Sequence, residues 1–450
     1  MSFRGIGEEE LRVPKYFGTD GVRGVAGEEL TCELAFRLGR AAGRAFRPQR
    51  VLLARDTRAS GPALEAGCAA GLAEAGCDVA LAGILPSPAV SHLVRQHKFQ
   101  LGCVISASHN PPQDNGIKFY DPQGLKLSPE EEERVESLLD GRPQGGKLGS
   151  VEPWTEAEDR YREFLFHTVE GLSLTPLKIA LDCAHGATAR VAPQVLAALG
   201  AKLSLIGGEI DGSRINVTGA AATGPLQALV QAEEADLGIA FDGDGDRVMF
   251  VAPDGQVVEG DRLMAALAPE LARLGELSTR AVVFTVLGNM GAERYLREQG
   301  FQVVRVPVGD RHVSWTMREQ GIELGGEPSG HIVFGRYAPT GDGILIALLT
   351  LRALQRLSTD LKELVSPVPV YPQVKADVPV KDKAKAMEDP EVQRAIAAAE
   401  GMVGQGGRLL VRPSGTQPLI RVMAEGENEP RLRRAVNTVV NALGAYRTNA

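Results

Sequence analysis

The sequence predicts an α/β fold of three similar domains with mixed sheets, followed by a smaller C-terminal α+β domain. Short apolar segments alternate with helix-like stretches of about 10–15 residues, a pattern typical of α/β units. This alternation occurs in three successive parts of the chain, and each time its third strand leads into an unusual polar loop. The length of 450 residues, at roughly 150 per domain, also predicts about three domains.

The expected elements follow one order in all three parts: strand, helix, strand, helix, strand. In the first part they are 51–56, 63–76, 77–82, 89–98 and 101–106. In the second they are 178–182, 190–200, 201–206, 224–234 and 235–241. In the third they are 281–286, 291–300, 301–306, 310–321 and 322–324. Because active sites of open α/β sheets form at strand ends, the polar loops after each third strand are candidate site loops.

A Pro-rich segment at 366–372 separates a last part with a different layout. There the sequence predicts a strand, a helix, two strands around a tight loop and a long terminal helix. We expect domains at 1–150, 151–255, 256–368 and 369–450, and these carry respectively a serine-containing loop, an acidic loop, a Gly-Glu-Pro-Ser-Gly-His loop and an Arg-Pro-Ser-Gly-Thr loop.

Composition and charge exclude several classes of protein. Lys and Arg number 49 against 57 Asp and Glu, a formal charge of −8, so no footprint for nucleic acid is visible. The longest apolar run, 344–351, is too short to cross a bilayer, and the polar N-terminus is not a signal peptide. Five scattered cysteines without a Cys-x-x-Cys pair indicate buried thiols in a reducing compartment. We therefore expect a cytoplasmic protein that binds neither membrane nor nucleic acid.

The strongest chemical signal is the alternating acidic motif of Asp242, Asp244 and Asp246, which follows an apolar strand. Residues i, i+2 and i+4 of extended backbone point to one side, and the intervening glycines let the carboxylates converge. Three clustered carboxylates repel one another unless a cation neutralises them, and hard oxygen ligands suit Mg²⁺ or Ca²⁺. An EF-hand is excluded because Arg247 and Pro253 stand where it needs Gly and Glu. The alternative is a solvated acidic turn.

Ser108 lies in the loop Ile-Ser-Ala-Ser-His-Asn-Pro-Pro. The chain has no Gly-x-Ser-x-Gly elbow, so an acylated serine of the hydrolase type has no support. A serine on a rigid loop can carry a phosphoryl group, or it can cap a turn, and the residues alone do not decide between the two. His109 and Lys118 are nearby candidates for acid/base or phosphate roles.

Three further loops offer polar groups. The loop between the last two strands combines hydroxyls, a glycine and two guanidiniums as an anion nest, although a hairpin turn explains it equally well. Its residues are Arg412, Ser414, Gly415, Thr416 and Arg421. A second loop carries Glu327, Ser329 and His331, which fit sugar hydroxyls or a simple turn, and a third places Arg23 among glycines. No nucleotide-binding P-loop motif is present.

Taken together, five motifs resemble the α-D-phosphohexomutase superfamily over nearly the whole chain. They are Phe-Gly-Thr-Asp-Gly-Val-Arg-Gly, Ile-Ser-Ala-Ser-His-Asn-Pro, Asp-Gly-Asp-Gly-Asp-Arg, Gly-Glu-Pro-Ser-Gly-His and Arg-Pro-Ser-Gly-Thr-Gln-Pro, in that order. The resemblance implies four domains around a central cleft and a phosphoserine at Ser108. It implies one Mg²⁺ per chain, held by a phosphoserine oxygen with Asp242, Asp244 and Asp246. It also implies sugar contacts from Glu327 and Ser329, and a phosphate grip by the Arg412 to Arg421 loop.

The implied activity is a sugar-phosphate isomerisation through a 1,6-bisphosphate. The likeness is greatest to the branch that interconverts glucosamine 6-phosphate and glucosamine 1-phosphate for UDP-N-acetylglucosamine synthesis. A glucose or mannose mutase of the same superfamily, a Mg²⁺-dependent phosphatase and a silent sugar-phosphate binder are the alternatives. The expected partner is a small sugar phosphate, and a homodimer is one assembly that remains open.

The chain departs from the usual residues of that branch at a few positions. Pro328 stands where Gln is usual and Gln417 where Glu is usual. The second domain reads Ile-Asn-Val-Thr-Gly-Ala-Ala-Ala-Thr-Gly-Pro at 215–225 in place of an Asn-x-x-Cys-Gly-Ser stretch, and 308–317 also differs. These departures leave the residues of the phosphoryl chemistry in place and concern the choice of sugar.

Overall fold

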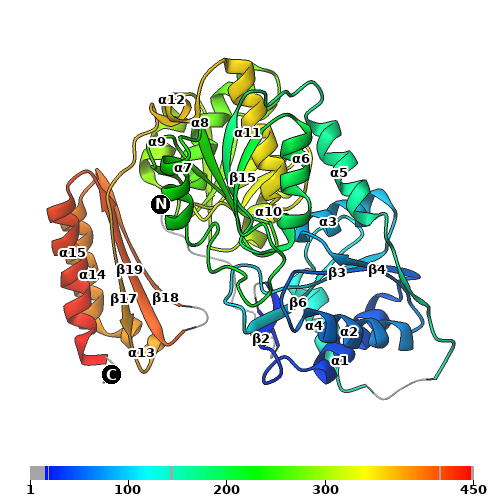
Figure 1. The fold of residues 1–450 in the computed structure, drawn as a ribbon. Coiled ribbons are helices and arrows are strands. Elements are labelled where there is room, and N and C mark those ends of the chain that lie inside the picture. The colour runs from blue at the N-terminus through cyan, green and yellow to red at the C-terminus, as the bar shows by residue number, and fades with distance from the viewer. Residues whose placement is uncertain (1–15, 19, 142–144, 415–416, 447–450) are drawn as a thin grey trace. The chain divides into compact units, whose positions relative to one another are not determined.

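The computed structural model describes residues 16–18, 20–141, 145–414 and 417–446. The chain forms two compact units, one of Met1–Leu287 with Phe301–Val365 and the other of Gly288–Gly300 with Ser366–Ala450. Figure 1 shows the elements of both units. The second unit resumes at Ser366, where the predicted Pro-rich segment begins. The boundaries expected for the four domains stay predictions.

The first part of the chain builds a seven-stranded mixed sheet with the order β1-β2-β6-β5-β3-β4-β7. Its strands are β1 (Phe17–Gly18), β2 (Gly21–Val25), β3 (Arg50–Arg55), β4 (Asp78–Ile84), β5 (Leu101–Ile105), β6 (Asp114–Tyr120) and β7 (Val151–Pro153). Its helices are α1 (Cys32–Phe46), α2 (Gly61–Glu74), α3 (Ser87–Gln96) and α4 (Pro129–Ser137). The apolar strands β3 and β5 pair in parallel at its centre, which explains their continuous hydrophobic runs.

The next two parts form a five-stranded and a four-stranded sheet. The strands of the former are β8 (Lys178–Asp182), β9 (Lys202–Ile206), β10 (Leu237–Phe241), β11 (Val248–Val251) and β12 (Val257–Val258). Those of the latter are β13 (Ala281–Thr285), β14 (Gln302–Val306), β15 (Leu324–Gly326) and β16 (Ile332–Phe334). The helices and 3₁₀ turn that accompany them are α5 (Ala157–Thr168), η1 (Ala187–Arg190), α6 (Ala192–Ala198), α7 (Gly224–Ala232), α8 (Gly260–Arg273), α10 (Asp310–Gln320), α11 (Gly343–Leu357) and α12 (Leu361–Val365).

One strand order recurs in all three sheets, as the sequence repeat predicts. The orders are β6-β5-β3-β4, β11-β10-β8-β9 and β16-β15-β13-β14. In each, the third strand of the repeat pairs in parallel with the first and antiparallel with the strand that follows it. The three polar loops are therefore the connections β5–β6, β10–β11 and β15–β16, which occupy the same place in each repeat.

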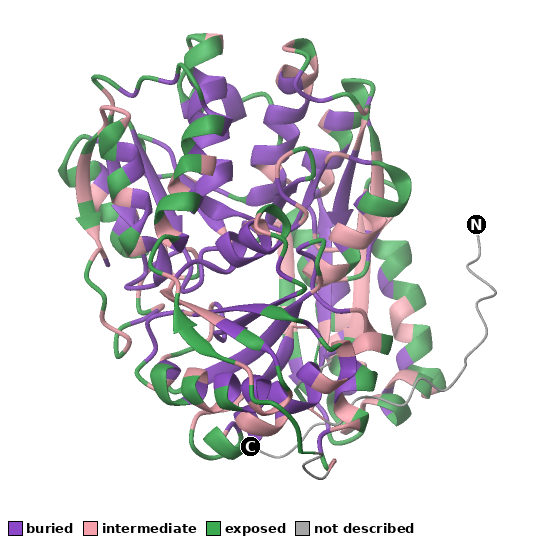
Figure 2. Cartoon of the chain, turned by 90° about the vertical axis from the view of Figure 1, so that its right-hand side faces the viewer, coloured by how far each residue is buried: buried purple, intermediate pink, exposed green. Residues whose placement is uncertain are grey.

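The core of the first unit lies along these strands and on the helix faces that cover them (Figure 2). All five residues of β5 and all five of β10 are buried. The apolar run 344–351 is the buried middle of α11, which packs on α5, α8 and neighbouring strands. Within the described residues, no helix has the length and apolar character that a membrane span needs. Four cysteines are buried as expected, but Cys32 is exposed because it begins α1 on its solvent side.

The second unit has a three-stranded antiparallel sheet with the order β17-β19-β18. Its strands are β17 (Gln373–Pro379), β18 (Gly407–Pro413) and β19 (Leu419–Gly426), and its helices are α9 (Met290–Glu298), α13 (Lys383–Glu388), α14 (Pro390–Val403), α15 (Glu429–Ala442) and the 3₁₀ turn η2 (Leu443–Tyr446). Helices α14 and α15 pack side by side on the sheet (Figure 1). This is the smaller α+β layout that the sequence predicts.

Candidate active site

Ser108 stands on the β5–β6 loop in a backbone conformation that few non-glycine residues adopt. Its φ is 50°, in the left-handed region, and it is 1% exposed. The Ser108 amide donates to Ser106 Oγ at 2.9 Å, and Ser108 Oγ donates to Asp242 Oδ2 at 2.8 Å. A non-glycine residue in this region costs of order 1–3 kcal/mol, so the surrounding contacts must impose the conformation.

The Arg58 side chain imposes much of this backbone conformation at Ser108. Arg58 was not predicted from the sequence. It is fully buried, its Nε lies 2.9 Å from Asp56 Oδ2, and it donates to the carbonyls of Ser108 at 3.0 Å and Asn110 at 2.8 Å. The carbonyls of Pro111 and Asp114 are further acceptors of the same guanidinium. Burial raises the pKa of Asp56, and the charge of Arg58 opposes that rise. A single guanidinium fork thus holds four carbonyls of the serine loop.

The three aspartates of the β10–β11 loop converge as predicted. Each offers a carboxylate oxygen that lies within 4.8 Å of the other two, and all three residues are buried. Gly243 permits this because a Cβ there would lie 2.7 Å from the Ser108 carbonyl oxygen. Burial, together with the charges of Asp246 and Asp244, raises the pKa of Asp242 well above its usual range. The cluster is therefore electrostatically unfavourable without a cation.

The carboxylate oxygens of the three aspartates are suitable ligands for Mg²⁺. Asp244 Oδ1 and Asp246 Oδ1 are buried, and within the described part of the chain neither has a hydrogen-bond partner. Unsatisfied buried carboxylate oxygens are costly unless a ligand coordinates them. Every member of the set is a hard oxygen, which Mg²⁺ prefers.

Basic side chains surround the cluster. Lys118 Nζ, brought in by β6, lies 2.6 Å from Asp244 Oδ2, and the Arg247 Nε lies 4.0 Å from carboxylate oxygens of Asp242 and Asp246. Burial disfavours the charge on Lys118, but Asp244 outweighs it and the pKa of Lys118 is raised. The converse holds for Asp244, whose pKa burial would raise but Lys118 lowers. The ammonium therefore stays charged in the buried site.

Two other predicted residues, His109 and Arg23, also face this region. His109 Nδ1 lies 3.4 Å from Ser108 Oγ, and burial, with the charges of Arg247 and Arg23, lowers the pKa of His109 to about 3. Arg23 pairs with Asp20 and donates to Asn110 Oδ1 at 3.4 Å. Near neutral pH, His109 is thus a neutral imidazole beside the serine.

The third polar loop, β15–β16, lies against the β10–β11 loop that carries the three aspartates. The Val248 amide donates to the Gly330 carbonyl at 3.0 Å, which brings the β15–β16 connection beside the aspartates. Glu327 Oε1 accepts from the Gly309 amide at 3.2 Å, and the exposed Ser329 hydroxyl lies 3.5 Å from Glu327 Oε2. The Val248–Gly330 bond thus places this loop next to the loop of the aspartates.

His331, the remaining predicted member of that loop, is 2% exposed, and its Nε2 lies 3.7 Å from Asp310 Oδ2. Lys126 pairs with both Asp310 and Asp20, so a chain of ion pairs extends from this loop to Arg23. Sequence reasoning missed Asp310, Lys126 and Asp20. The sugar contact expected of His331 stays a prediction.

The predicted anion nest belongs to the second unit. Arg412 and Arg421 stand directly opposite each other on β18 and β19, and burial together with Arg421 lowers the pKa of Arg412. Like charges in cross-strand register are unfavourable, so an anion between them would relieve the repulsion. Lys383 Nζ donates to the Ser414 carbonyl at 2.6 Å and adds a third cation. Gly415 and Thr416, also expected here, lie outside the described residues.

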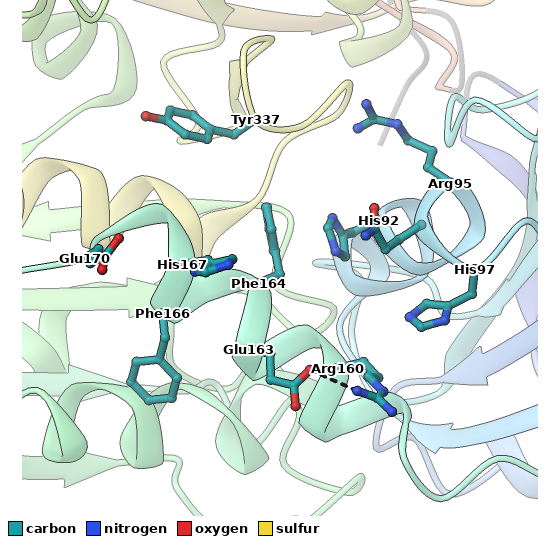
Figure 3. Close-up of a pocket in the computed structure, with 11 residues that line it drawn as sticks. His92, Arg95, His97, Arg160, Glu163, Phe164, Phe166, His167, Glu170 and Tyr337 are labelled. Carbon is teal, nitrogen blue, oxygen red and sulfur yellow. Dashed lines mark hydrogen bonds and ion pairs between the residues drawn. The ribbon is translucent and has the colours of Figure 1, made fainter.

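A separate groove of about 1080 Å³ runs between α3 and α5 (Figure 3). Its lining includes the His92 ring, which stacks on Phe164 with centroids 3.7 Å apart, and Tyr337 of the third repeat. Arg160 on its rim is paired with Glu156 and Glu163. The groove shares no residue with the candidate site.

Comparison with known families identifies the family of the chain. Four family models match in order: phosphoglucomutase/phosphomannomutase domains I, II and III and the C-terminal domain, at residues 14–144, 159–255, 259–371 and 376–442. This chain belongs to the phosphoglucomutase/phosphomannomutase family, the α-D-phosphohexomutases. Within the family it is similar to phosphoglucosamine mutases. One from Geobacillus kaustophilus is 44% identical over 95% of this chain and 98% of the relative, and one from Thermus thermophilus is 48% identical over 92% and 94%.

Solved structures of the family share the fold. A phosphoglucomutase/phosphomannomutase family protein from Burkholderia thailandensis has a TM-score of 0.80 at 27% identity, covering 94% of this chain and 96% of its own. An Aspergillus fumigatus N-acetylphosphoglucosamine mutase, solved with GlcNAc-6P and magnesium, has a TM-score of 0.69 at 17% identity, covering 96% of each chain. At that identity the second likeness shows the fold alone.

Proposed function

We propose that this protein interconverts glucosamine 6-phosphate and glucosamine 1-phosphate through a phosphoserine at Ser108. The observation that carries the proposal is the hydroxyl of Ser108, held 2.8 Å from Asp242 at the edge of a buried carboxylate cluster. A serine so placed can present a phosphoryl group to a cation and to an incoming sugar hydroxyl. The phosphoglucosamine mutases at 44% and 48% identity support the choice of sugar.

In the proposed reaction the phosphoryl group leaves Ser108 Oγ for O1 of glucosamine 6-phosphate. The bond from phosphorus to the serine oxygen breaks and the bond to O1 forms, while the proton of the sugar hydroxyl passes, directly or through a base, to Ser108 Oγ, which leaves as a hydroxyl. The resulting 1,6-bisphosphate turns over and returns its 6-phosphoryl group to Ser108, which regenerates the phosphoserine and leaves glucosamine 1-phosphate. The sugar 1,6-bisphosphate is therefore both intermediate and activator.

Asp242, Asp244 and Asp246 would hold one Mg²⁺ together with an oxygen of the phosphoserine. When bound, the ion neutralises charge on the phosphoryl group being transferred. Lys118 and Arg247 supply further positive charge from the protein itself. Because phosphoryl transfer depends mainly on positioning and charge neutralisation, these groups together can carry the catalysis.

The other site residues bind and orient the sugar phosphate. Glu327 and Ser329 would accept and donate hydrogen bonds at sugar hydroxyls, and the loop from Arg412 to Arg421 would grip the phosphate that is not reacting. Arg23 would add positive charge beside Ser108, and the neutral His109 would add a polar imidazole there. We place this reaction in the cytoplasm, where the thiols of the chain would stay reduced.

A coupled assay with glucosamine 6-phosphate, a catalytic amount of bisphosphate and Mg²⁺ tests the proposal. We expect turnover by the wild type, loss of at least 10³-fold in Ser108→Ala as for removal of other covalent nucleophiles, and loss on adding EDTA. Unimpaired Ser108→Ala would overturn the phosphoserine mechanism. Faster turnover of glucose or mannose 6-phosphate would assign another sugar in the family, and release of inorganic phosphate without isomerisation would indicate a phosphatase.

A further inference from the structure

One side chain, that of Asn216, joins the serine loop (β5–β6) to the metal loop, the β10–β11 connection that carries the three aspartates. Its Nδ2 donates to the carbonyls of Ser108 at 2.8 Å and Asn110 at 2.9 Å, and its Oδ1 accepts from the Gly243 amide at 2.8 Å. The residue lies between β9 and α7 in the segment 215–225. None of these bonds involves a reacting atom.

The backbone at Asn216 is arranged to deliver that amide. Its φ is 62°, a left-handed conformation in which asparagine is enriched, and its amide donates to the Ala184 carbonyl at 3.0 Å. The two loops pack closely around this bridge, because a Cβ at Gly243 would lie 2.7 Å from the Ser108 oxygen and 2.8 Å from Asn216 Nδ2. Only a primary amide of this length supplies two donors and one acceptor at these places.

The direct link between the loops depends on the state of the serine. In the unphosphorylated enzyme the Ser108 hydroxyl donates a hydrogen bond to Asp242. Once Ser108 carries a phosphoryl group, Oγ has no proton and this hydrogen bond is lost. The bonds of Asn216 to backbone groups are available in both states, so they can keep the serine backbone and the aspartate loop in the same register throughout the cycle.

We propose that Asn216 is a positioning residue that fixes the phosphoserine against the metal loop for phosphoryl transfer. The proposal rests on the proposed function, because it assigns the register of the same site. Loss of the bridge should lower the rate of transfer without changing the sugar contacts, which come from other loops. Removing groups that orient metal ligands commonly costs 10–100-fold in activity or metal affinity, and a comparable loss is expected here.

Two variants test the bridge. Asn216→Gly removes the side chain and tolerates the left-handed backbone, so strain does not obscure the result. Asn216→Asp keeps the size and the acceptor for Gly243 but loses both donors. The matched control is Thr218→Val in the same segment, which removes the 2.9 Å hydrogen bond from Thr218 Oγ1 to Asp182 and touches neither loop.

Steady-state kinetics, single-turnover transfer from the ³²P-labelled phosphoserine enzyme and Mg²⁺ titration of the melting temperature give three independent measurements. We expect both Asn216 variants to fold, to lose 10–100-fold in kcat and in the transfer rate, to bind Mg²⁺ more weakly, and to keep KM for the sugar within about threefold. Thr218→Val should match the wild type in all three.

Wild-type kinetics in both Asn216 variants would overturn the inference, and so would a loss confined to KM or shared equally by Thr218→Val. If either Asn216 variant misfolds, the other decides, because one preserves size and the other preserves backbone freedom. Absence of mutase turnover in the wild type would refute the proposed function instead, and the Mg²⁺ titration would still decide whether Asn216 sets the register of the metal loop.

Discussion

The pair of Asp56 and Arg58 gives the sharpest test of how the serine loop is held. Both side chains have 0% exposure, and Arg58 is the partner of one carboxylate and four carbonyls. Replacing it in Arg58→Met fills most of the volume but leaves Asp56 without its cation. Breaking a buried pair by removing one partner costs about 3–5 kcal/mol, and we expect a loss of that size in the unfolding free energy near pH 7.5.

The pH dependence of this loss separates charge from packing. In the variant, burial raises the pKa of Asp56 and no guanidinium opposes it. An acid whose folded-state pKa is raised contributes stability at low pH that disappears as the pH rises through that pKa. The difference between Arg58→Met and wild type should therefore be smaller at pH 5 than at pH 8. In the double variant Asp56→Asn with Arg58→Met, this extra pH dependence should vanish.

Urea unfolding followed by tryptophan fluorescence measures the effect. Both tryptophans, Trp154 and Trp315, lie in the first unit, so the signal reports the unit that contains the pair. The control is Arg273→Met, which removes an exposed ion pair with Glu270 and should cost at most about 1 kcal/mol. A loss below about 1 kcal/mol in Arg58→Met at both pH values would refute the reasoning.

Three further predictions concern groups around the same unit. Mg²⁺ should raise the melting temperature of the wild type and EDTA should reverse the rise, because the ion relieves repulsion among the aspartates. Burial raises the pKa of Asp342, which accepts from Tyr161 at 2.8 Å and from the Leu345 amide, to about 6. Its stabilising contribution is therefore lost as the pH rises from about 4 to 6, and Asp342→Asn should flatten that part of the stability profile. Burial lowers the pKa of His92 to about 4, so its NMR signals should not titrate between pH 8 and 6, and its contribution to stability should fall as the pH drops below 6.5.

Local pattern was enough to find most of the parallel sheet. The run at 178–182 is strand β8 to the residue, and the other apolar runs lie within a few residues of their strands. Several elements were not anticipated, among them strand β2 and helices α1, α5 and α8. Strand β2 reads as a glycine-rich loop; it pairs with the short strand β1 and, over a longer ladder, with β6, whose antiparallel partners lie 89–95 residues later in the chain. Such pairing is a tertiary effect that no local propensity contains.

The residues of the site divide in the same way, into those that a local sequence pattern predicts and those that only the tertiary structure reveals. Ser108, Lys118 and the three aspartates were found because the groups offered to a ligand stand close together in short motifs. Arg58 and Asn216 escaped notice because each acts on a loop distant in sequence, by 50 residues for the Arg58 bond to Ser108 and by 108 for that of Asn216. A lone arginine or asparagine carries no sign of the carbonyls it will meet. Only the fold reveals that backbone oxygens are their targets.

The energetics explain why these distant residues are needed. The left-handed backbone of Ser108 costs of order 1–3 kcal/mol, and the serine loop must also hold its hydroxyl against a cluster of mutually repelling carboxylates. A loop that only displayed its motif would relax away from this arrangement. The hydrogen bonds from the Arg58 guanidinium to four carbonyls of the loop, at roughly 1.5–3 kcal/mol each for a charged donor, are together large enough to oppose that relaxation. The contacts that keep Ser108 beside the aspartates are thus supplied by residues outside the recognisable motifs.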